Sequence, residues 1–419
     1  MFKSKDKKML VMLVSIAMVF SALAVISFEA QPTYAVATQT FGHHNGNVVY
    51  VNNAVPIGTD TGFSSPGYNT ISSALANAQP GETIMVAPGT YNEAIVISTP
   101  DIKIIGSGIG QTIIEPLSAS DFTTTTDIDD GSYADAIVLI TSQGSGSAVE
   151  QLTVDGSAAA PSVFPLQYYG VYFQDASGML RSTAINNIIY PSDLGKQHIG
   201  AVLVNNGYYY ANLNVATQIN VTIVDNIITN YGKNGITAND PGVFAMIRGN
   251  KVTGYGPDPD NAQNGIQIGF GAGGIVVGNR VSGNSYSNPS NTENYLTASY
   301  MAGGIIVYDS NATIIGNTLE GNDVGIWIAN YGGHDLPVVV AKNKIKDSYG
   351  YGIVFDSDNG TATKNFISDS PVGIMATTYM NYNTVVRAHN NEFNDVSVDY
   401  QTLEPNPPYY ATIIVGQND

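Results

Sequence analysis

Residues 304–328 read GIIVYDSNATIIGNTLEGNDVGIWI, and they contain one whole unit of a two-part pattern and the start of the next unit. Each unit opens on a Gly followed by a short β-branched run, and it closes on an Asn that has an apolar residue two positions further on. Eight copies of the unit predict a repeat architecture. The opening glycines are Gly170, Gly200, Gly235, Gly265, Gly304, Gly325, Gly352 and Gly373. The closing asparagines are Asn187, Asn226, Asn250, Asn279, Asn317, Asn343, Asn365 and Asn391.

The runs themselves have the composition of short strands. Each is rich in Val, Ile and Thr and is bounded by Gly, Asn, Asp or Ser, which is typical of a strand followed by a turn. We expect parallel strands stacked as a solenoid, in which the first residue after the Gly points inward and the next points outward. The expected outer column is Tyr172, Val202, Thr237, Gln267, Ile306, Trp327, Val354 and Met375.

The closing asparagines are expected at a corner of each coil. Equivalent Asn side chains stacked about 4.8 Å apart can hydrogen-bond from coil to coil as a ladder. Asn also tolerates the left-handed backbone conformation that such a corner needs. We therefore assign these asparagines a structural role and no chemistry.

This pattern resembles the right-handed parallel β-helix of the pectin-lyase-like superfamily over about residues 80 to 400. Residues 69–97, NTISSALANAQPGETIMVAPGTYNEAIVI, look like the start of such a domain, with a short helix near Ile71 to Ala78 before the first coil. The segment PGTYNE at 88–93 resembles the first coil of pectin methylesterases. The resemblance implies an all-β, right-handed parallel β-helix of about ten coils with an N-terminal capping helix.

The resemblance carries no specific activity. The catalytic Asp and Arg segments of pectin methylesterases have no match, and neither do the catalytic signatures of polygalacturonases, mannuronan epimerases or pectate lyases. A fold shared by many enzymes does not define a reaction.

The N-terminal segment suggests export. Residues 1–35 have a basic start and an apolar run from Met9 to Phe28, which predicts a secretory signal peptide, with an uncleaved membrane anchor as the alternative. We expect an N-terminal extension with the capping helix at 36–80, the β-helix at 81–400 and a closing segment at 401–419. A secreted or cell-surface location follows, with no membrane span after cleavage.

Composition limits the partners. The chain has 16 Lys and Arg against 34 Asp and Glu, for a net charge of −18, which disfavours nucleic acid. It has no Cys, so disulfides and thiolate metal sites are excluded. Three sequons, at Asn220, Asn311 and Asn359, are candidate glycosylation sites. The sequence does not define the oligomeric state.

The longest insertions between a closing Asn and the next opening Gly follow the first, third and fourth units, at 188–199, 252–264 and 280–303. All leave from the same corner, so we expect them to wall a cleft that binds an extracellular polysaccharide. Candidate catalytic residues there are Lys233, His198, Tyr231 and Lys196. Candidate substrate-binding residues are Tyr255, Glu293, Tyr295, Tyr300, Trp327 and Gln267.

Two reactions fit these residue types. A lyase needs a base, for which Lys233 or His198 are candidates, a donor such as Tyr231, and a cation such as Ca²⁺, for which Asp258 and Asp260 are candidate ligands. A hydrolase needs two carboxylates, drawn from Asp258, Asp260 and Glu293.

Each candidate also has a structural interpretation. PDPDN at 257–261 is ordinary turn chemistry, the Lys and His residues suit solvated loops, and Trp327 suits packing beneath a loop. A row of acids and amides after the Gly strands suits a solvated corner, with Ca²⁺ binding between coils as the alternative. This corner row is Asn205, Asp240, Asp309, Asn330 and Asp356.

Two functions therefore remain open. The first is binding, and possible lyase-like or hydrolase-like processing, of an extracellular polysaccharide at the cleft, which the grouped insertions favour. The second is a non-enzymatic cell-surface or envelope protein or adhesin, which the absence of family catalytic signatures favours.

Overall fold

The computed structural model describes residues 47–122, 124–126, 133–158, 167–189, 199–207, 217–258, 261–286, 301–332 and 336–416. These residues belong to one compact unit, His44–Asp419. The expected signal peptide at 1–35 lies outside the described residues and stays a prediction.

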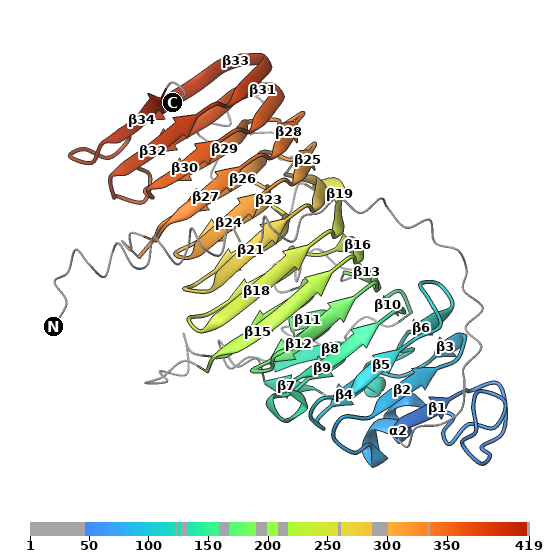
Figure 1. The fold of residues 1–419 in the computed structure, drawn as a ribbon. Coiled ribbons are helices and arrows are strands. Elements are labelled where there is room, and N and C mark those ends of the chain that lie inside the picture. The colour runs from blue at the N-terminus through green and yellow to red at the C-terminus, as the bar shows by residue number, and fades with distance from the viewer. Residues whose placement is uncertain are drawn as a thin grey trace, which may run out of the picture. The chain divides into compact units, whose positions relative to one another are not determined.

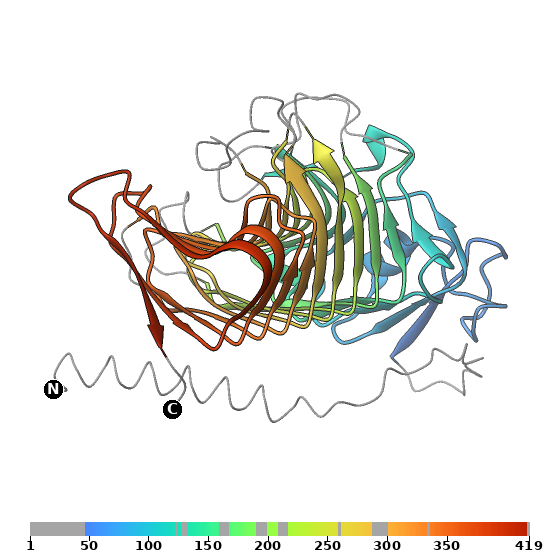
Figure 2. The same cartoon turned by 90° about the horizontal axis from the view of Figure 1, so that it is seen from above.

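The described chain winds into a parallel β-helix with three faces (Figure 1, Figure 2). Face 1 is a sheet of thirteen strands among the described residues. These strands, in order along the stack, are β1 (Val48–Val51), β2 (Thr83–Val86), β5 (Lys103–Ile105), β9 (Ser147–Glu150), β12 (Gly178–Arg181), β15 (Ile219–Val224), β18 (Val243–Arg248), β21 (Gly273–Val277), β24 (Asn311–Ile315), β27 (Val338–Ala341), β30 (Gly360–Thr363), β32 (Thr384–His389) and β34 (Ala411–Gly416).

Faces 2 and 3 are the two halves of the second sheet. Face 2 contains β3 (Gly89–Tyr91), β6 (Thr112–Ile114), β10 (Thr153–Asp155), β13 (Ala184–Ile188), β16 (Ile227–Tyr231), β19 (Lys251–Asp258), β22 (Arg280–Tyr286), β25 (Thr318–Glu320) and β28 (Lys344–Lys346). Face 3 contains β4 (Ile95–Ile97), β8 (Tyr133–Ile140), β11 (Gln167–Gln174), β14 (Ile199–Asn205), β17 (Asn234–Asn239), β20 (Asn264–Gly269), β23 (Gly303–Tyr308), β26 (Val324–Ala329) and β29 (Tyr351–Asp356). The long strands β31 (Phe366–Thr377) and β33 (Glu392–Leu403) run across both faces.

The predicted all-β parallel fold is confirmed. Each coil adds strands to the three faces in turn, as β15, β16 and β17 do before β18 returns to face 1. The exception to parallel pairing among the described strands is β7 (Thr125–Thr126), which pairs antiparallel with β8. Face 1 has more strands than the about ten coils expected, because β1, β2, β5 and β9 form coils before the first Gly–Asn unit.

The N-terminal helix is also present. Helix α2 (Ile71–Asn77) begins after Thr70, whose side chain accepts a hydrogen bond from the Ser73 amide. The Glu93 carboxylate accepts hydrogen bonds from the amides of Ile71 and Ser72, each at 2.8 Å. An anion at a helix N-terminus satisfies free amides and favours the helix dipole. The acid of PGTYNE therefore has an architectural role. Two short 3₁₀ turns, η1 (Ala119–Asp121) and η2 (Ser142–Gly144), are the other helical segments described.

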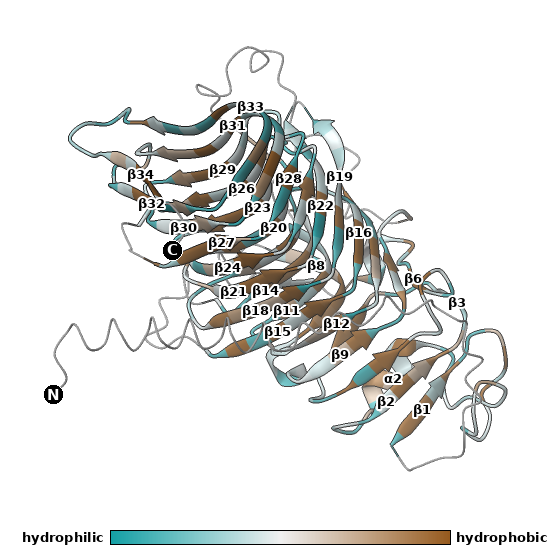
Figure 3. Cartoon of the chain, turned by 45° about the horizontal axis from the view of Figure 1, so that its top comes forward, coloured by the Kyte–Doolittle hydropathy of each residue, from teal (hydrophilic) through white to brown (hydrophobic). Residues whose placement is uncertain are grey.

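One continuous apolar core runs through the coils. The first residues after the opening glycines, such as Ile236, Ile266, Ile305 and Ile326, are fully buried in it, as predicted. Burial of each such side chain contributes about 1.5–3 kcal/mol. Figure 3 shows hydrophobic segments of neighbouring strands aligned in bands along the stack.

The opening glycines allow this close packing. A Cβ added at Gly325 would lie 2.6 Å from the carbonyl oxygen of Gly352 and 2.6 Å from Cγ2 of Ile345. A methyl group cannot be placed at such distances without movement of the backbone. Gly is therefore required at position 325 by contact with the next coil.

The outer column differs from prediction at one position. Tyr172 pairs with Leu203, and Leu203 pairs with Thr237, so Leu203 and not Val202 belongs to the column. In β14, Ala201 aligns with the opening glycines of the neighbouring coils, and Gly200 precedes that position by one residue. Because Gly200 and Ala201 are both small, the sequence alone did not show which of them aligns with the other opening glycines.

The Asn ladder is present from Asn226 to Asn391. Asn279 is typical: its side-chain nitrogen donates to Oδ1 of Asn317 at 3.0 Å and to the carbonyl oxygen of Ile247 at 2.9 Å. Its Oδ1 accepts from the backbone amide and the side chain of Asn250, each at 2.9 Å. The same contacts recur in the other coils.

Two details of the predicted ladder are wrong. Thr183, not Asn187, occupies the ladder position in the first unit, where its amide donates to Oδ1 of Asn226. The ladder Asn residues do not adopt the left-handed conformation either; the residue before each of them does, for example Asp225 (φ 56°) and Gly249 (φ 67°). Asn187 itself is left-handed (φ 60°), at the next corner of its coil.

Candidate functional site

The outward side chains of face 3 form the surface that the predicted cleft residues border. The middle column of this surface is Tyr172, Leu203, Thr237, Gln267, Ile306, Trp327, Val354 and Met375. All of these side chains are buried except Trp327, which is half-buried. Outward-facing residues of face 3 are thus largely covered and are not a solvated surface.

The chemistry of this surface changes along the stack. Tyr169, Tyr172 and Leu203 belong to an apolar cluster at the N-terminal side, and Tyr351 and Val354 belong to another at the C-terminal side. Between the two clusters lie polar residues of β17 and β20, which we call the amide patch. The amide patch consists of Asn234, Thr237, Asn239, Asn264 and Gln267.

The amide patch is connected by side-chain hydrogen bonds. Asn264 donates to Oδ1 of Asn234 at 3.0 Å, Asn234 donates to Oε1 of Gln267 at 3.4 Å, and Gln267 donates to Oδ1 of Asn239 at 3.1 Å. Primary amides offer donors and acceptors together, which suits the hydroxyl groups of a sugar. Gln267, a predicted substrate-binding residue, is therefore in a chemically suitable setting.

Lys233 lies at the corner directly before β17. Its side chain is half-buried and its ammonium donates to the carbonyl oxygen of Ala262. Burial lowers the pKa of the Lys233 amine from 10.5 to about 8. A lysine with such a pKa has a useful neutral fraction near neutral pH and can accept a proton. Among the predicted catalytic residues, Lys233 is the one whose described surroundings fit its role.

Tyr231 does not fit the predicted role of proton donor. Its side chain is fully buried in the main core, where its hydroxyl donates to Oδ1 of Asn284 at 2.5 Å. Burial raises the pKa of the Tyr231 phenol far above its usual range. The preceding residue, Asn230, is left-handed (φ 53°), and this corner turns Tyr231 inward, away from any ligand on face 3.

Tyr255 and Asp258 lie on β19, next to a register shift between Thr253 and Gly256. Tyr255 is 38% exposed and its hydroxyl donates to the Asp258 carboxylate, which is buried. Among the described residues, no group of three or more His, Asp and Glu side chains is placed to hold a metal ion. The Ca²⁺ site also involves Asp260, which lies outside the described residues, so it stays a prediction.

Several other predicted residues cannot be placed. Lys196, His198, Glu293, Tyr295 and Tyr300 also lie outside the described residues. The base of the third insertion is described, however. The buried Asp323 carboxylate accepts hydrogen bonds from the amides of Tyr286 and Ala302, each at 2.9 Å. Because Tyr286 and Ala302 lie within this insertion, on the two parts of it that are described, Asp323 fixes the position of both parts on the stack. No sequence signal singled out this residue.

Trp327 is part of an aromatic group at the C-terminal side of face 3. The ring of Tyr308 lies 6.5 Å from that of Trp327 and 5.5 Å from that of Tyr331. Tyr331 is 48% exposed, and its amide donates to the Asp309 carboxylate at 2.6 Å. Flat apolar faces with polar edges are suited to stacking against sugar rings.

From the sequence, Asp356 was interpreted as one residue of the solvated corner row. This interpretation is wrong. Asn205, Asp240, Asn330 and Asp356 are all buried. Burial raises the pKa of the Asp356 carboxyl from 3.8 to about 6, although hydrogen bonds from Ser357 and two backbone amides oppose the shift. Asp356 and Asp309 also help to raise the pKa of Tyr331, after burial. Sequence reasoning considered Asp356 only as a possible Ca²⁺ ligand of this row and did not identify it as a candidate acid.

Comparisons with known proteins agree on the fold. A family described as a right handed beta helix region matches residues 211–393. No curated protein matches the chain by sequence. The structure is similar to the lacto-N-biosidase of family GH136 from Eubacterium ramulus, with a TM-score of 0.56 and 13% identity over 88% of this chain and 68% of that one.

A second solved structure is related more distantly. The A-module of the mannuronan C-5 epimerase AlgE4 from Azotobacter vinelandii has a TM-score of 0.48 and 14% identity, over 82% of this chain and 94% of that one. At these identities the likeness concerns the fold. No helix in the described part of the chain has the length and apolar character needed to cross a membrane.

Proposed function

Since the chain is a right-handed parallel β-helix protein with the pectin-lyase-like fold, we propose that it binds an extracellular polysaccharide at face 3, where Lys233, Asn234 and Asn239 are partly exposed, and cleaves it by a lyase-like reaction. The observation that carries the proposal is the position of Lys233, a half-buried amine with a lowered pKa that directly precedes the amide patch. The likeness to a lacto-N-biosidase supports a carbohydrate ligand in general. The apolar N-terminal segment supports export.

The reaction would act on a uronic-acid unit. The neutral Lys233 amine takes the proton from the carbon next to the carboxylate, a carbon–carbon double bond forms, and the bond to the leaving sugar oxygen breaks. That oxygen takes a proton from a donor or from water. The amide patch would orient the sugar hydroxyls. Because Tyr231 lies in the core, this proton comes from another residue or from water.

The test uses the purified protein with a panel of uronic-acid and neutral polysaccharides. Ultraviolet absorbance of the unsaturated product and the number of reducing ends are followed together. We expect both to rise on a uronic-acid polymer, with kcat/KM increasing as pH rises through about 8. Lys233→Met should abolish the rise, while Lys103→Met, which changes an exposed lysine on β5, should not. Equal rates in wild type and Lys233→Met would refute the assignment of the base.

A hydrolase is the second candidate reaction, and Asp356 is the observation that favours it. A carboxyl whose pKa is raised to about 6 is suited to protonate a leaving group. Asp309 and the rings of Trp327 and Tyr331 lie in the same region. Reducing ends without ultraviolet absorbance, lost in Asp356→Asn and kept in Lys233→Met, would identify this reaction.

A non-enzymatic surface protein is the remaining alternative. The last coil exposes apolar side chains, with Val398 at 43%, Ile414 at 45% and Val415 at 57%. Such a group of exposed apolar residues is typical of a contact surface. A folded protein that leaves every polysaccharide of the panel unchanged, in the absence and presence of Ca²⁺, would favour this alternative.

A further inference from the structure

Positive charge is concentrated on one edge of the stack, between faces 1 and 2. Of the seven Lys and Arg residues that the sequence contains from position 248 to 364, six lie there and the seventh, Lys346, ends β28 on the adjoining face 2; all seven are exposed. We call this group the basic edge. It consists of Arg248, Lys251, Arg280, Lys342, Lys344, Lys346 and Lys364. The chain as a whole has a net charge of −18, so this edge opposes the general charge of the protein.

The register of face 2 places these cations in line with the stack. Lys251 pairs with Arg280, Arg280 with Thr318, and Thr318 with Lys344. Neighbouring strands are about 4.8 Å apart. Three of four successive coils therefore present a cation at the same place, in a row parallel to the axis.

Two further lysines occupy positions where the backbone is unfavourable for them. Lys342 and Lys364 each have φ 55°, at the corner where three earlier coils have Gly249, Gly278 and Gly316. The left-handed conformation costs a residue with a Cβ about 1–2 kcal/mol relative to Gly. Lys at these corners adds charge to the edge at the expense of local stability.

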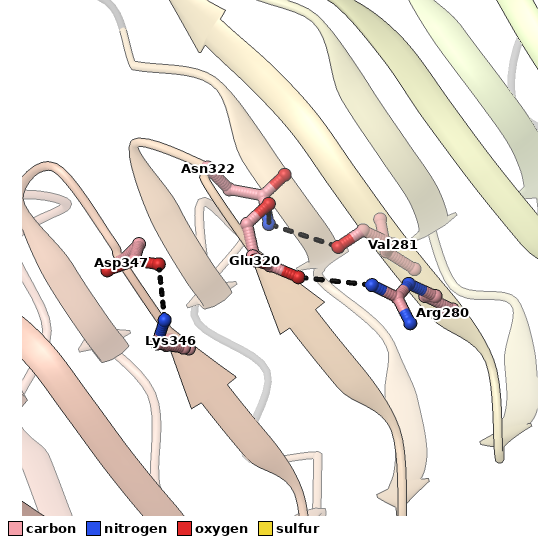
Figure 4. Close-up of polar contacts among 6 residues, drawn as sticks. All are labelled: Arg280, Val281, Glu320, Asn322, Lys346 and Asp347. Carbon is pink, nitrogen blue, oxygen red and sulfur yellow. Dashed lines mark hydrogen bonds and ion pairs between the residues drawn. The ribbon is translucent and has the colours of Figure 1, made fainter.

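In the described part of the chain, acids form two ion pairs with the basic edge, and Glu392 continues the row two coils beyond Lys344. Arg280 forms an ion pair with Glu320 at 3.2 Å, and Lys346 forms one with Asp347 at 3.1 Å (Figure 4). Both pairs are exposed, and such pairs are weak enough to be exchanged for a ligand. Among the described residues, Lys251, Lys342, Lys344 and Lys364 form no ion pair.

We propose that the basic edge is an attachment site for a linear anionic polysaccharide that lies along the stack axis. The row of cations requires a partner with regularly repeated negative charge, such as carboxylate or sulfate on successive sugars. A neutral polymer would leave these charges unused. The row is narrow and the rest of the protein is acidic, so a thin single chain fits better than a duplex nucleic acid. This site is separate from face 3 and does not depend on the reaction proposed there.

The test measures binding of the full protein to polygalacturonate, dextran sulfate, neutral dextran and duplex DNA by calorimetry at several salt concentrations. Two variants remove one exposed cation each: Lys344→Gln on the basic edge, and Arg387→Gln on β32 of face 1 as the matched control. A fourfold variant combines Lys251→Gln, Arg280→Gln, Lys344→Gln and Lys346→Gln.

We expect binding to one or both anionic polysaccharides that weakens as salt increases. Lys344→Gln should weaken it about two- to fivefold and the fourfold variant by about 20-fold or more, since each exposed charge contact is worth a fraction of a kcal/mol. Arg387→Gln should bind as the wild type does. Which polymer binds more tightly decides between carboxylate and sulfate.

Three results would overturn the proposal. They are undiminished affinity in the fourfold variant, equal affinity for neutral dextran, and equal or tighter binding of duplex DNA. The two proposals can be tested separately. Lys233→Met should keep the affinity of the basic edge for anionic polysaccharide and lose turnover. The fourfold variant should lose that affinity and keep turnover on short substrates. Near-identical circular dichroism spectra of all variants exclude misfolding as the cause.

Discussion

Replacement of Asp356 by Asn should change how the stability of the protein depends on pH. Burial raises the pKa of this carboxyl from 3.8 to about 6, so the folded protein holds the proton more tightly than the unfolded chain does. The stabilising contribution of the protonated group is therefore complete below pH 3.8. It decreases between 3.8 and about 6, and it is lost above about 6.

The size of the effect follows from the shift. A difference of about two pKa units corresponds to about 3 kcal/mol, at 1.36 kcal/mol per unit. Asn cannot ionise and keeps the shape of the side chain. The free energy of unfolding of the variant, relative to the wild type, should therefore rise by about 3 kcal/mol between acidic and neutral pH.

The assay is urea unfolding followed by tryptophan fluorescence at about pH 4 and about pH 7. Trp327 is the single Trp of the chain and lies on β26, which pairs with the strand of Asp356. The signal therefore reports unfolding of the relevant coils even when distant coils unfold separately. Glu392→Gln on β33, an exposed carboxyl, gives the background pH dependence.

A constant difference between Asp356→Asn and the wild type at the two pH values would refute the reasoning. It would mean that the carboxyl is solvated in the folded protein. The argument for Asp356 as a proton donor in the alternative hydrolase reaction would then also be lost.

Three further substitutions test the Asn ladder, the amine of Lys233 and the contact between coils at Gly325. Asn279→Ala should lower the free energy of unfolding by about 3 kcal/mol, because buried partners lose their hydrogen bonds; a loss below 1 kcal/mol in urea unfolding would contradict the ladder's importance. Lys233→Met should stabilise the protein, since the lysine pKa falls from 10.5 to about 8. This gain should be full below pH 8, decline as pH rises towards 10.5 and vanish above it, as thermal melts across that range would show. Gly325→Ala should destabilise by about 1–3 kcal/mol through its contact with the next coil, and an unchanged melting temperature would show that the coils can separate there.

The fold was predictable because every coil repeats the same local signals. Gly325 and Asn279 stand at positions that most coils fill in the same way, so many weak signals support one interpretation. The errors occurred where a coil offers two candidates. Gly200 precedes Ala201, so the pattern alone could not decide which small residue takes the shared position. In the first unit Thr183 takes the ladder position, and the nearest Asn with the expected spacing, Asn187, lies at the next corner.

The site was less predictable, because burial there depends on tertiary contacts. Lys233 and Gln267 were recognised as polar residues at informative positions, but Tyr231 was misplaced. Alternation of side chains along a strand fails where a left-handed residue, here Asn230, turns the chain. The burial of Asp356 likewise follows from neighbouring coils and not from its own segment.

The Asn ladder has a consequence for the length of the protein. Each interior Asn makes the same contacts with the coil before it and the coil after it, so no rung identifies its own number in the series. Removal or duplication of a whole coil should leave every remaining rung with a correct neighbour. The length of the stack is therefore adjustable in steps of about 4.8 Å, and its outer surfaces can be lengthened or shortened by whole coils without redesign of the core.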